Sequence, residues 1–244
     1  MLVVILLIFV VILAVWYSRR SSGAPSEVLD DDTIFEPAEV EKDVNSPVGF
    51  GYKTSWFAVK SAHYEKLVQY FGLTNVREAT WKAGIDAAYE DGIFISPEMD
   101  SWNLIVGNSL PSGDSKEGIK ETTELLKTLS GEFGEAQFFS THRVVEFHCW
   151  MKAVNGNMER LYSYIGESGE TIAYEGKPTA IEEQFNLINT LSEEAQQKDY
   201  FGREDLTYPD EELVMLVARD WSIDPTQLDE RKEPTEPGLM GRRF

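Results

Sequence analysis

Hydrophobic residues change their spacing along the chain, and each spacing predicts a different kind of element. The apolar run from Met1 to Tyr17 carries no charged side chain, Gly or Pro. About 17 helical residues at roughly 1.5 Å each span about 25 Å, the short end of a bilayer core. Trp16 lies where an interfacial aromatic belongs, and Arg19 and Arg20 follow the run. We therefore expect residues 1–17 to be a single-pass transmembrane anchor that contacts the lipid bilayer.

The basic residues next to this run predict its orientation. None precedes it and two follow it, so the positive-inside rule favours a carboxy-terminal domain in the cytoplasm, and we expect this domain to be held at the inner (cytoplasmic) membrane. The alternative is a cleaved secretory signal. That alternative is disfavoured, because such a signal starts with basic residues and has a shorter apolar core.

Polar residues then replace the apolar run. Residues 18–52 hold eight acidic and three basic side chains and show no hydrophobic periodicity. We expect a flexible acidic linker, which an anionic leaflet would repel.

Residues 53–227 alternate between the strand period and the helix period, which predicts one folded domain. In residues 78–89, Trp81, Ile85 and Ala88 fall on one helical stripe. Other helices are predicted over residues 62–71 and 115–130 and in a run through Leu213 and Val217. A Thr179/Glu182 capping box opens a further helix, and Asp224–Pro225 opens a short terminal one.

Tight turns predict the sheet. "NGN" and "GESG" favour hairpins, because Asn and Gly tolerate positive φ. Strands are predicted over residues 54–61, 92–96, 101–108, 136–139, 143–154, 158–165 and 170–174. The last four form a β-meander, so the fold class is α+β: a mainly antiparallel sheet flanked by helices, behind the transmembrane helix. Residues 228–244 show no pattern and are predicted to be a disordered tail.

The net charge of the chain limits the classes of molecule that it can bind. The formal net charge is −20 and the pI about 4.5, so nucleic acid is excluded as the main partner by repulsion from its phosphates. A neutral or basic protein is favoured. The single cysteine, Cys149, cannot form a disulfide within the chain.

The stretch "STHRVVEFHCW", Ser140 to Trp150, holds two of the three histidines. If it is one continuous strand, Glu146 and His148 share a face about 7 Å apart, while His142 lies about 20 Å from His148. Glu146 and His148 are therefore candidate catalytic residues and candidate ligands of a metal-assisted hydrolase. A zinc site needs three or four ligands, so a partly buried polar face is the favoured interpretation, and we expect no metal.

The loop "SLPSGDSKEG" lies between a predicted strand and a predicted helix, a common place for a binding rim. Its candidate binding residues are Ser109, Ser112, Asp114 and Lys116. The chain has no nucleophile elbow, phosphate-binding loop or dinucleotide fingerprint. We therefore expect no cofactor.

Blocks such as "WFAVKS", "EGKPTAIEE" and "PDEELVMLVARDWSIDPTQL" resemble a group of uncharacterised bacterial proteins. Such acidic single-domain α+β proteins are similar to immunity proteins, which bind toxins. The main hypothesis is a membrane-anchored protein-interaction module. The alternatives are the metal-assisted hydrolase and an immunity protein.

Overall fold

The computed structural model describes residues 45–60, 63–233 and 235–243. The predicted anchor, residues 1–17, and most of the predicted linker lie outside this range. Within it, no helix is both long and apolar enough to cross a bilayer.

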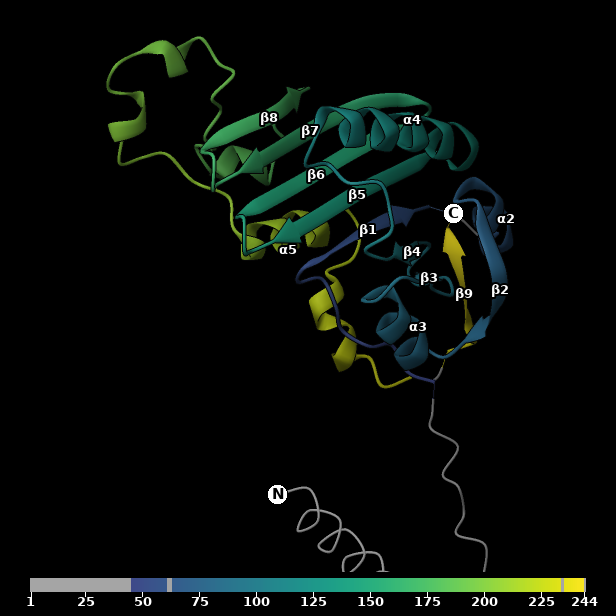
Figure 1. Ribbon diagram of the computed structural model, residues 1–244. Helices are drawn as coiled ribbons and strands as arrows, with labels where there is room; N and C mark the ends of the chain where they lie inside the picture. Colours follow the sequence, from purple (N-terminus) through teal and green to yellow (C-terminus); the bar gives the residue numbers. More distant parts are fainter. Residues whose placement is uncertain (1–44, 61–62, 234, 244) are drawn as a thin grey trace, which may run out of the picture. The chain divides into compact units, whose positions relative to one another are not determined.

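The described residues form an α+β fold around a nine-stranded antiparallel sheet in the order β2-β9-β3-β4-β1-β5-β6-β7-β8 (Figure 1). The strands are β1 (Thr54–Val59), β2 (Leu73–Ala79), β3 (Ile93–Ile95), β4 (Asn103–Val106), β5 (Glu135–His142), β6 (Phe147–Val154), β7 (Asn157–Ile165), β8 (Glu170–Glu175) and β9 (Gly238–Arg243). The α-helices are α2 (Tyr64–Tyr70), α3 (Trp81–Ala88), α4 (Lys116–Phe133) and α5 (Glu211–Trp221), and the 3₁₀ turns are η1 (Glu182–Gln184), η2 (Glu194–Gln196), η3 (Tyr200–Gly202) and η4 (Pro225–Glu230). The predicted α+β class, with an antiparallel sheet flanked by helices, and the β5–β8 meander are confirmed; the predicted transmembrane helix lies outside the described residues.

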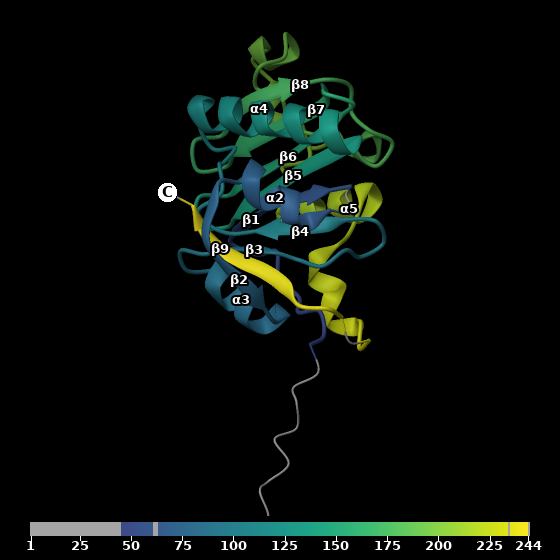
Figure 2. The ribbon, with the colours of Figure 1, turned by 90° about the vertical axis from the view of Figure 1, so that its right-hand side faces the viewer.

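Helices cover both faces of the sheet. α2 and α4 pack on one face, which we call the α4 face, and α3 and α5 pack on the other, the α5 face (Figure 2). Each strand residue contributes to one face only, because side chains alternate along a strand. Phe57 and Phe138 belong to the α4 face, whereas Trp56 and Phe139 belong to the α5 face.

Five aromatic side chains cross the α5 face in register, one from each of five adjacent strands. They are Trp56, Phe139, Trp150, Tyr162 and Tyr174. The rings of Trp56 and Phe139 stack with centroids 5.2 Å apart, and those of Trp150 and Tyr162 stack at 4.6 Å. Cross-strand aromatic pairs of this kind stabilise a sheet beyond their buried area.

A buried ion pair between Arg160 and Glu182 holds the segment after β8 against this aromatic row. Arg160 Nε donates to Glu182 Oε1 at 2.8 Å, and Trp150 Nε1 donates to the same oxygen at 2.8 Å. Thr179 donates to Glu182 Oε2 from both its backbone N–H and its hydroxyl. The Thr179–Glu182 contact of the predicted capping box thus forms, but no α-helix follows it: only the 3₁₀ turn η1 does, with Ile181 as its N-cap, and Glu182 also pairs with Arg160.

The predicted disordered tail is wrong where it is described. Gly238–Arg243 is β9, which lies between β2 and β3. η4 precedes it, and Leu228 is fully buried. β2 was not predicted, and it takes up the start of the predicted helix over residues 78–89.

The predicted start of the folded domain at residue 53 is also too late. Asn45 accepts a hydrogen bond from the Trp81 backbone N–H and donates to Thr235 and Glu236. The Phe50 ring is buried edge-on against Trp56, with centroids 5.9 Å apart. The last residues assigned to the linker therefore belong to the domain.

Candidate functional site

A hollow on the α5 face lies beside α5, and we call it the α5 groove. Its volume is about 430 Å³, within the range of pockets that bind ligands or side chains of a partner. Its lining comprises Tyr52, Phe185, Thr207, Tyr208, Asp210, Glu212, Leu213, Met215, Leu216, Arg219, Asp224 and Thr226.

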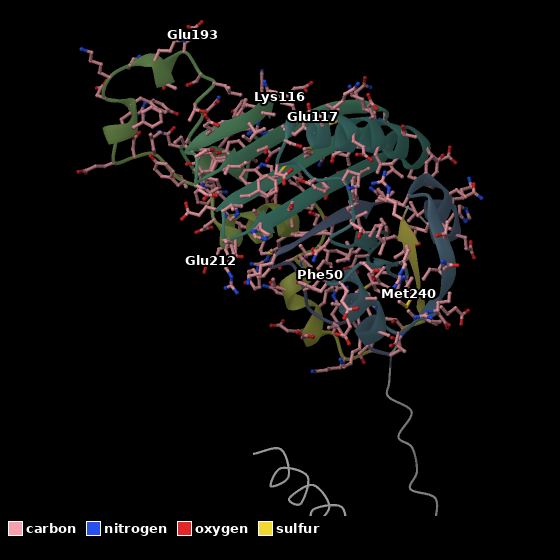
Figure 3. The ribbon with its side chains drawn as sticks, in the orientation of Figure 1. Phe50, Lys116, Glu117, Glu193, Glu212 and Met240 are labelled. Atoms are coloured by element: carbon pink, nitrogen blue, oxygen red, sulfur yellow. The ribbon has the colours of Figure 1, made fainter. Side chains whose placement is uncertain are left out.

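The amino-terminal end of α5 forms one end of the groove. Asp210 is the helix N-cap, and its Oδ1 accepts a hydrogen bond from the Leu213 N–H at 2.8 Å. This bond satisfies one of the helix donors that lack a partner within the helix. Glu212 is exposed on the outer side of the fold in the first turn (Figure 3). Two carboxylates therefore lie at this end.

An ion pair forms the other end of the groove. Arg219 Nη2 donates to Asp224 Oδ2 at 2.6 Å. The second oxygen of Asp224 accepts from the backbone N–H and the hydroxyl of Thr226. The Arg219 charge is therefore already neutralised by Asp224, which also caps η4.

Two tyrosines stand on the rim of the groove. Tyr52 is 46% exposed and Tyr208 is 48% exposed. The Tyr52 backbone is held in place, because its C=O accepts a hydrogen bond from Tyr89 Oη at 2.9 Å. Gly51 has φ 127°, a backbone conformation that residues with a Cβ rarely adopt, so glycine favours this course of the chain beside Met215. The rim is thus preformed.

A buried polar row lies behind the groove on the same face. Its members are paired across four adjacent strands: Thr54, Thr141, His148 and Tyr164. Tyr164 joins the row to the rim, because its ring packs against Tyr208 with centroids 6.2 Å apart.

Burial shifts the pKa values of the two titratable side chains in this row, His148 and Tyr164. It lowers the pKa of His148 to about 4, although nearby Asp210 raises it in part. The His148 imidazole is therefore neutral near pH 7, and its Nδ1 lies 3.1 Å from Thr141 Oγ1. Burial also raises the pKa of Tyr164 to about 12, so its hydroxyl stays protonated.

The predicted strand over residues 143–154 is wrong at its start. Residues 143–146 form the turn between β5 and β6, and Glu146 lies in that turn with φ 51°. His142 and His148 are not about 20 Å apart along one strand: they lie on adjacent strands, one register step apart and on opposite faces. The turn of residues 143–146 has the sequence Arg-Val-Val-Glu, with no Gly, Pro, Asn or Asp, and it was not recognised as a turn.

The candidate pair Glu146 and His148 therefore does not share a strand face. Glu146 packs over Gly166, and the Gly166 N–H donates a hydrogen bond to the Glu146 backbone C=O at 2.9 Å. His148 lies in the polar row. In the part of the chain that the structure describes, no three His, Cys, Asp or Glu side chains gather closely enough to hold a metal ion. Cys149 is fully buried on the α4 face beneath Gly113, and burial raises the pKa of its thiol.

The predicted rim loop borders a second hollow, of about 460 Å³, with the β5–β6 hairpin. Ser112 and Asp114 line it, together with Ser140 and His142. Ser109 instead donates to the Asp91 C=O. Lys116 is the first residue of α4 and is not among the lining residues. The structure thus brings half of the predicted rim next to His142, a juxtaposition that the sequence did not predict.

No known protein family, no curated protein and no solved structure matches this chain. The resemblance to uncharacterised bacterial proteins and to immunity proteins stays a prediction.

Proposed function

We propose that the folded domain is a protein-interaction module that docks a segment of another protein in the α5 groove. The observation that carries this proposal is the pair of half-exposed tyrosines, Tyr52 and Tyr208, above an apolar floor that includes Leu213 and Met215. Tyrosine and other aromatic residues are enriched at the centres of protein interfaces, because they contribute large contact area at low entropic cost.

Binding fits the groove better than catalysis does. Asp210 and Asp224 are engaged as helix caps, and the described residues that line the groove include no His, Cys, Ser or Lys. A hydrolytic site needs a nucleophile or activated water next to a base. Glu146 lies in the β5–β6 turn and not on the strand face of His148, so a shared strand face does not support the hydrolase hypothesis. An immunity protein would use such a groove to hold its toxin, so that hypothesis is one form of the binding proposal.

Site-specific photo-crosslinking in living cells tests the docking site. The full chain carries a photoreactive amino acid at Tyr208 in one variant and at Val144, 71% exposed on the β5–β6 turn, in another. We expect a defined crosslinked product from position 208 and none from position 144. Equal products from both positions, or none from either, would contradict docking in the groove.

We propose further that residues 1–17 anchor the domain in the inner membrane, with the domain in the cytoplasm. The support is the uncharged apolar run followed by Arg19 and Arg20. Alkaline extraction of membranes tests the anchor by comparing the full chain with a variant that lacks residues 1–20. A topology reporter fused to the carboxy terminus tests the orientation. We expect only the full chain to stay in the membrane. A reporter active only outside the cytoplasm would overturn the orientation.

A further inference from the structure

We infer that the occupant of the α5 groove is a basic segment of a different protein, one in which Lys or Arg side chains stand between apolar ones. This inference rests on the proposed function and names the chemistry of its partner.

The expected apolar side chains of the partner follow from the apolar floor and walls of the groove. Leu213 and Met215 are buried beneath the groove, and Leu216 is half-buried beside them. Phe185 and the two rim tyrosines complete the apolar lining. An apolar side chain that enters would leave water for these surfaces, which favours binding by about 25 cal/mol per Å² of buried apolar area.

The expected Lys or Arg side chains of the partner follow from carboxylates in the groove that have no cationic partner. Glu212 has no ion pair or hydrogen bond with another described residue, and Asp210 uses only Oδ1 in its cap. The one cation in the lining, Arg219, is paired with Asp224 at the other end. A Lys or Arg at the α5 amino-terminal end would meet two carboxylates, and the faces of Tyr52 and Tyr208 also attract cations.

The chain's own charge argues against two other occupants. A second copy would bring another net charge of −20 to an acidic groove. The acidic stretch of residues 18–44 is repelled for the same reason. An anionic lipid surface is disfavoured too, because the carboxylates of Asp210 and Glu212 would face its headgroups.

Three peptides of equal length test this inference. They share Leu and Phe at the same positions and carry Lys, Gln or Glu between them. Fluorescence anisotropy measures their binding to the full chain held in discs of zwitterionic lipid. We expect the Lys peptide to bind at least about tenfold more tightly than the Gln peptide, and the Glu peptide to bind most weakly. The advantage of Lys should shrink when ionic strength rises from about 0.1 M to about 1 M, because the Debye length falls from about 10 Å to about 3 Å.

A charge-matched pair of variants locates the effect. Asp210→Asn with Glu212→Gln removes two charges from the groove and keeps the helix cap, because Asn caps as well as Asp. We expect it to weaken Lys-peptide binding about tenfold or more. Glu204→Gln with Asp220→Asn removes two exposed charges that do not line the groove, and should weaken binding less than about twofold. Equal effects of the two pairs would overturn the inference.

The other outcomes separate this inference from the proposed function. Gln and Lys peptides that bind equally, with both lost in Tyr52→Ala/Tyr208→Ala, would overturn the basic partner and leave the docking groove standing. Lys-peptide binding that the tyrosine variant does not change would count against both. Binding of the Lys peptide to empty discs at the same strength would assign the signal to lipid, and binding that requires dimeric protein would assign it to a second copy. Either result would overturn the inference.

Discussion

The two faces of the sheet are made from the same strands but are covered in different ways. On the α4 face, the 18-residue helix α4 lies over aliphatic and phenylalanine side chains and buries Leu126 and Leu129 completely. On the α5 face, the 11-residue helix α5 and the 8-residue helix α3 share the cover with 3₁₀ turns and loops, over rows of aromatic and polar side chains. Both covers leave a hollow: the second hollow borders Leu110 and Phe147 of the α4 face, whereas the α5 groove carries two half-exposed tyrosines on its rim. We expect the leucines packed under α4 to contribute more to stability than those that border the α5 groove.

The largest expected effect tests whether the buried ion pair holds the cover of the α5 face. Glu182→Ala leaves the Arg160 guanidinium buried without a counter-charge, and should lower the free energy of unfolding by about 3–5 kcal/mol. Urea unfolding of the full chain measures this. Glu183→Ala, at the exposed neighbouring position, is the control and should change stability by less than about 0.5 kcal/mol. Equal losses would show that Glu182 contributes no more than a surface carboxylate.

The next prediction compares leucines on the two faces. Leu126→Ala leaves a cavity under α4 and should cost about 2–5 kcal/mol. Leu213→Ala removes a side chain that borders the groove, so water fills the space and we expect a smaller cost, about 1–2 kcal/mol. Denaturant unfolding of both variants ranks them, and a larger cost for Leu213→Ala would reverse the proposed division between the faces.

The third prediction concerns acid. The pKa of His148 is about 4 in the folded chain and 6.5 in its ordinary state, so between these values the unfolded chain binds a proton that the folded chain does not. Stability is therefore lost as pH falls from 6.5 towards 4, by about 1–2 kcal/mol at pH 5.

Two substitutions check this assignment. His148→Gln should remove this part of the difference between pH 7 and pH 5 in urea unfolding, whereas His142→Gln, at an exposed position, should leave it unchanged. A pH dependence that follows His142 instead would refute the assignment.

The smallest expected effect on stability separates the groove from the core. Tyr52→Ala/Tyr208→Ala truncates two half-exposed rings and should lower the free energy of unfolding by less than about 1 kcal/mol. The same variant should lose peptide binding in the anisotropy measurement. A loss of several kcal/mol would mean that these rings belong to the core, and the binding result would then say nothing specific about the groove.

The sequence predicted the meander and the long helices well, because their patterns are local. Asn155 and Gly156 at a tight turn, and the stripe containing Leu126 and Leu129, each determine an element within a few residues. The sequence-based prediction failed where an element forms only by pairing with strands that are distant in the sequence. Gly238–Arg243 has no pattern of its own and becomes a strand because β2 and β3 flank it on both sides.

The candidate site was less predictable for the same reason. His148 was singled out correctly as a polar residue on an inner strand, but its neighbours Tyr164 and Asp210 come from other parts of the chain. Glu146 was assigned to the wrong element, because the turn before β6 has none of the usual turn residues. The groove joins Tyr52, Phe185 and Tyr208, more than 150 positions apart at the extremes, and no local pattern contains that information.

The position of β9 has a consequence for how the chain reaches this structure. Leu239 pairs with Ile95, more than a hundred residues earlier, so β2 and β3 are synthesised long before the strand that joins them. Until then each presents an unpaired edge, and such edges invite pairing with other chains. Closure of this loop is slow compared with local hairpins. The newborn protein therefore passes through a period in which the seven strands from β3 to β8 in the sheet order can already pair, while β2 and the outer edge of β3 still lack their common partner.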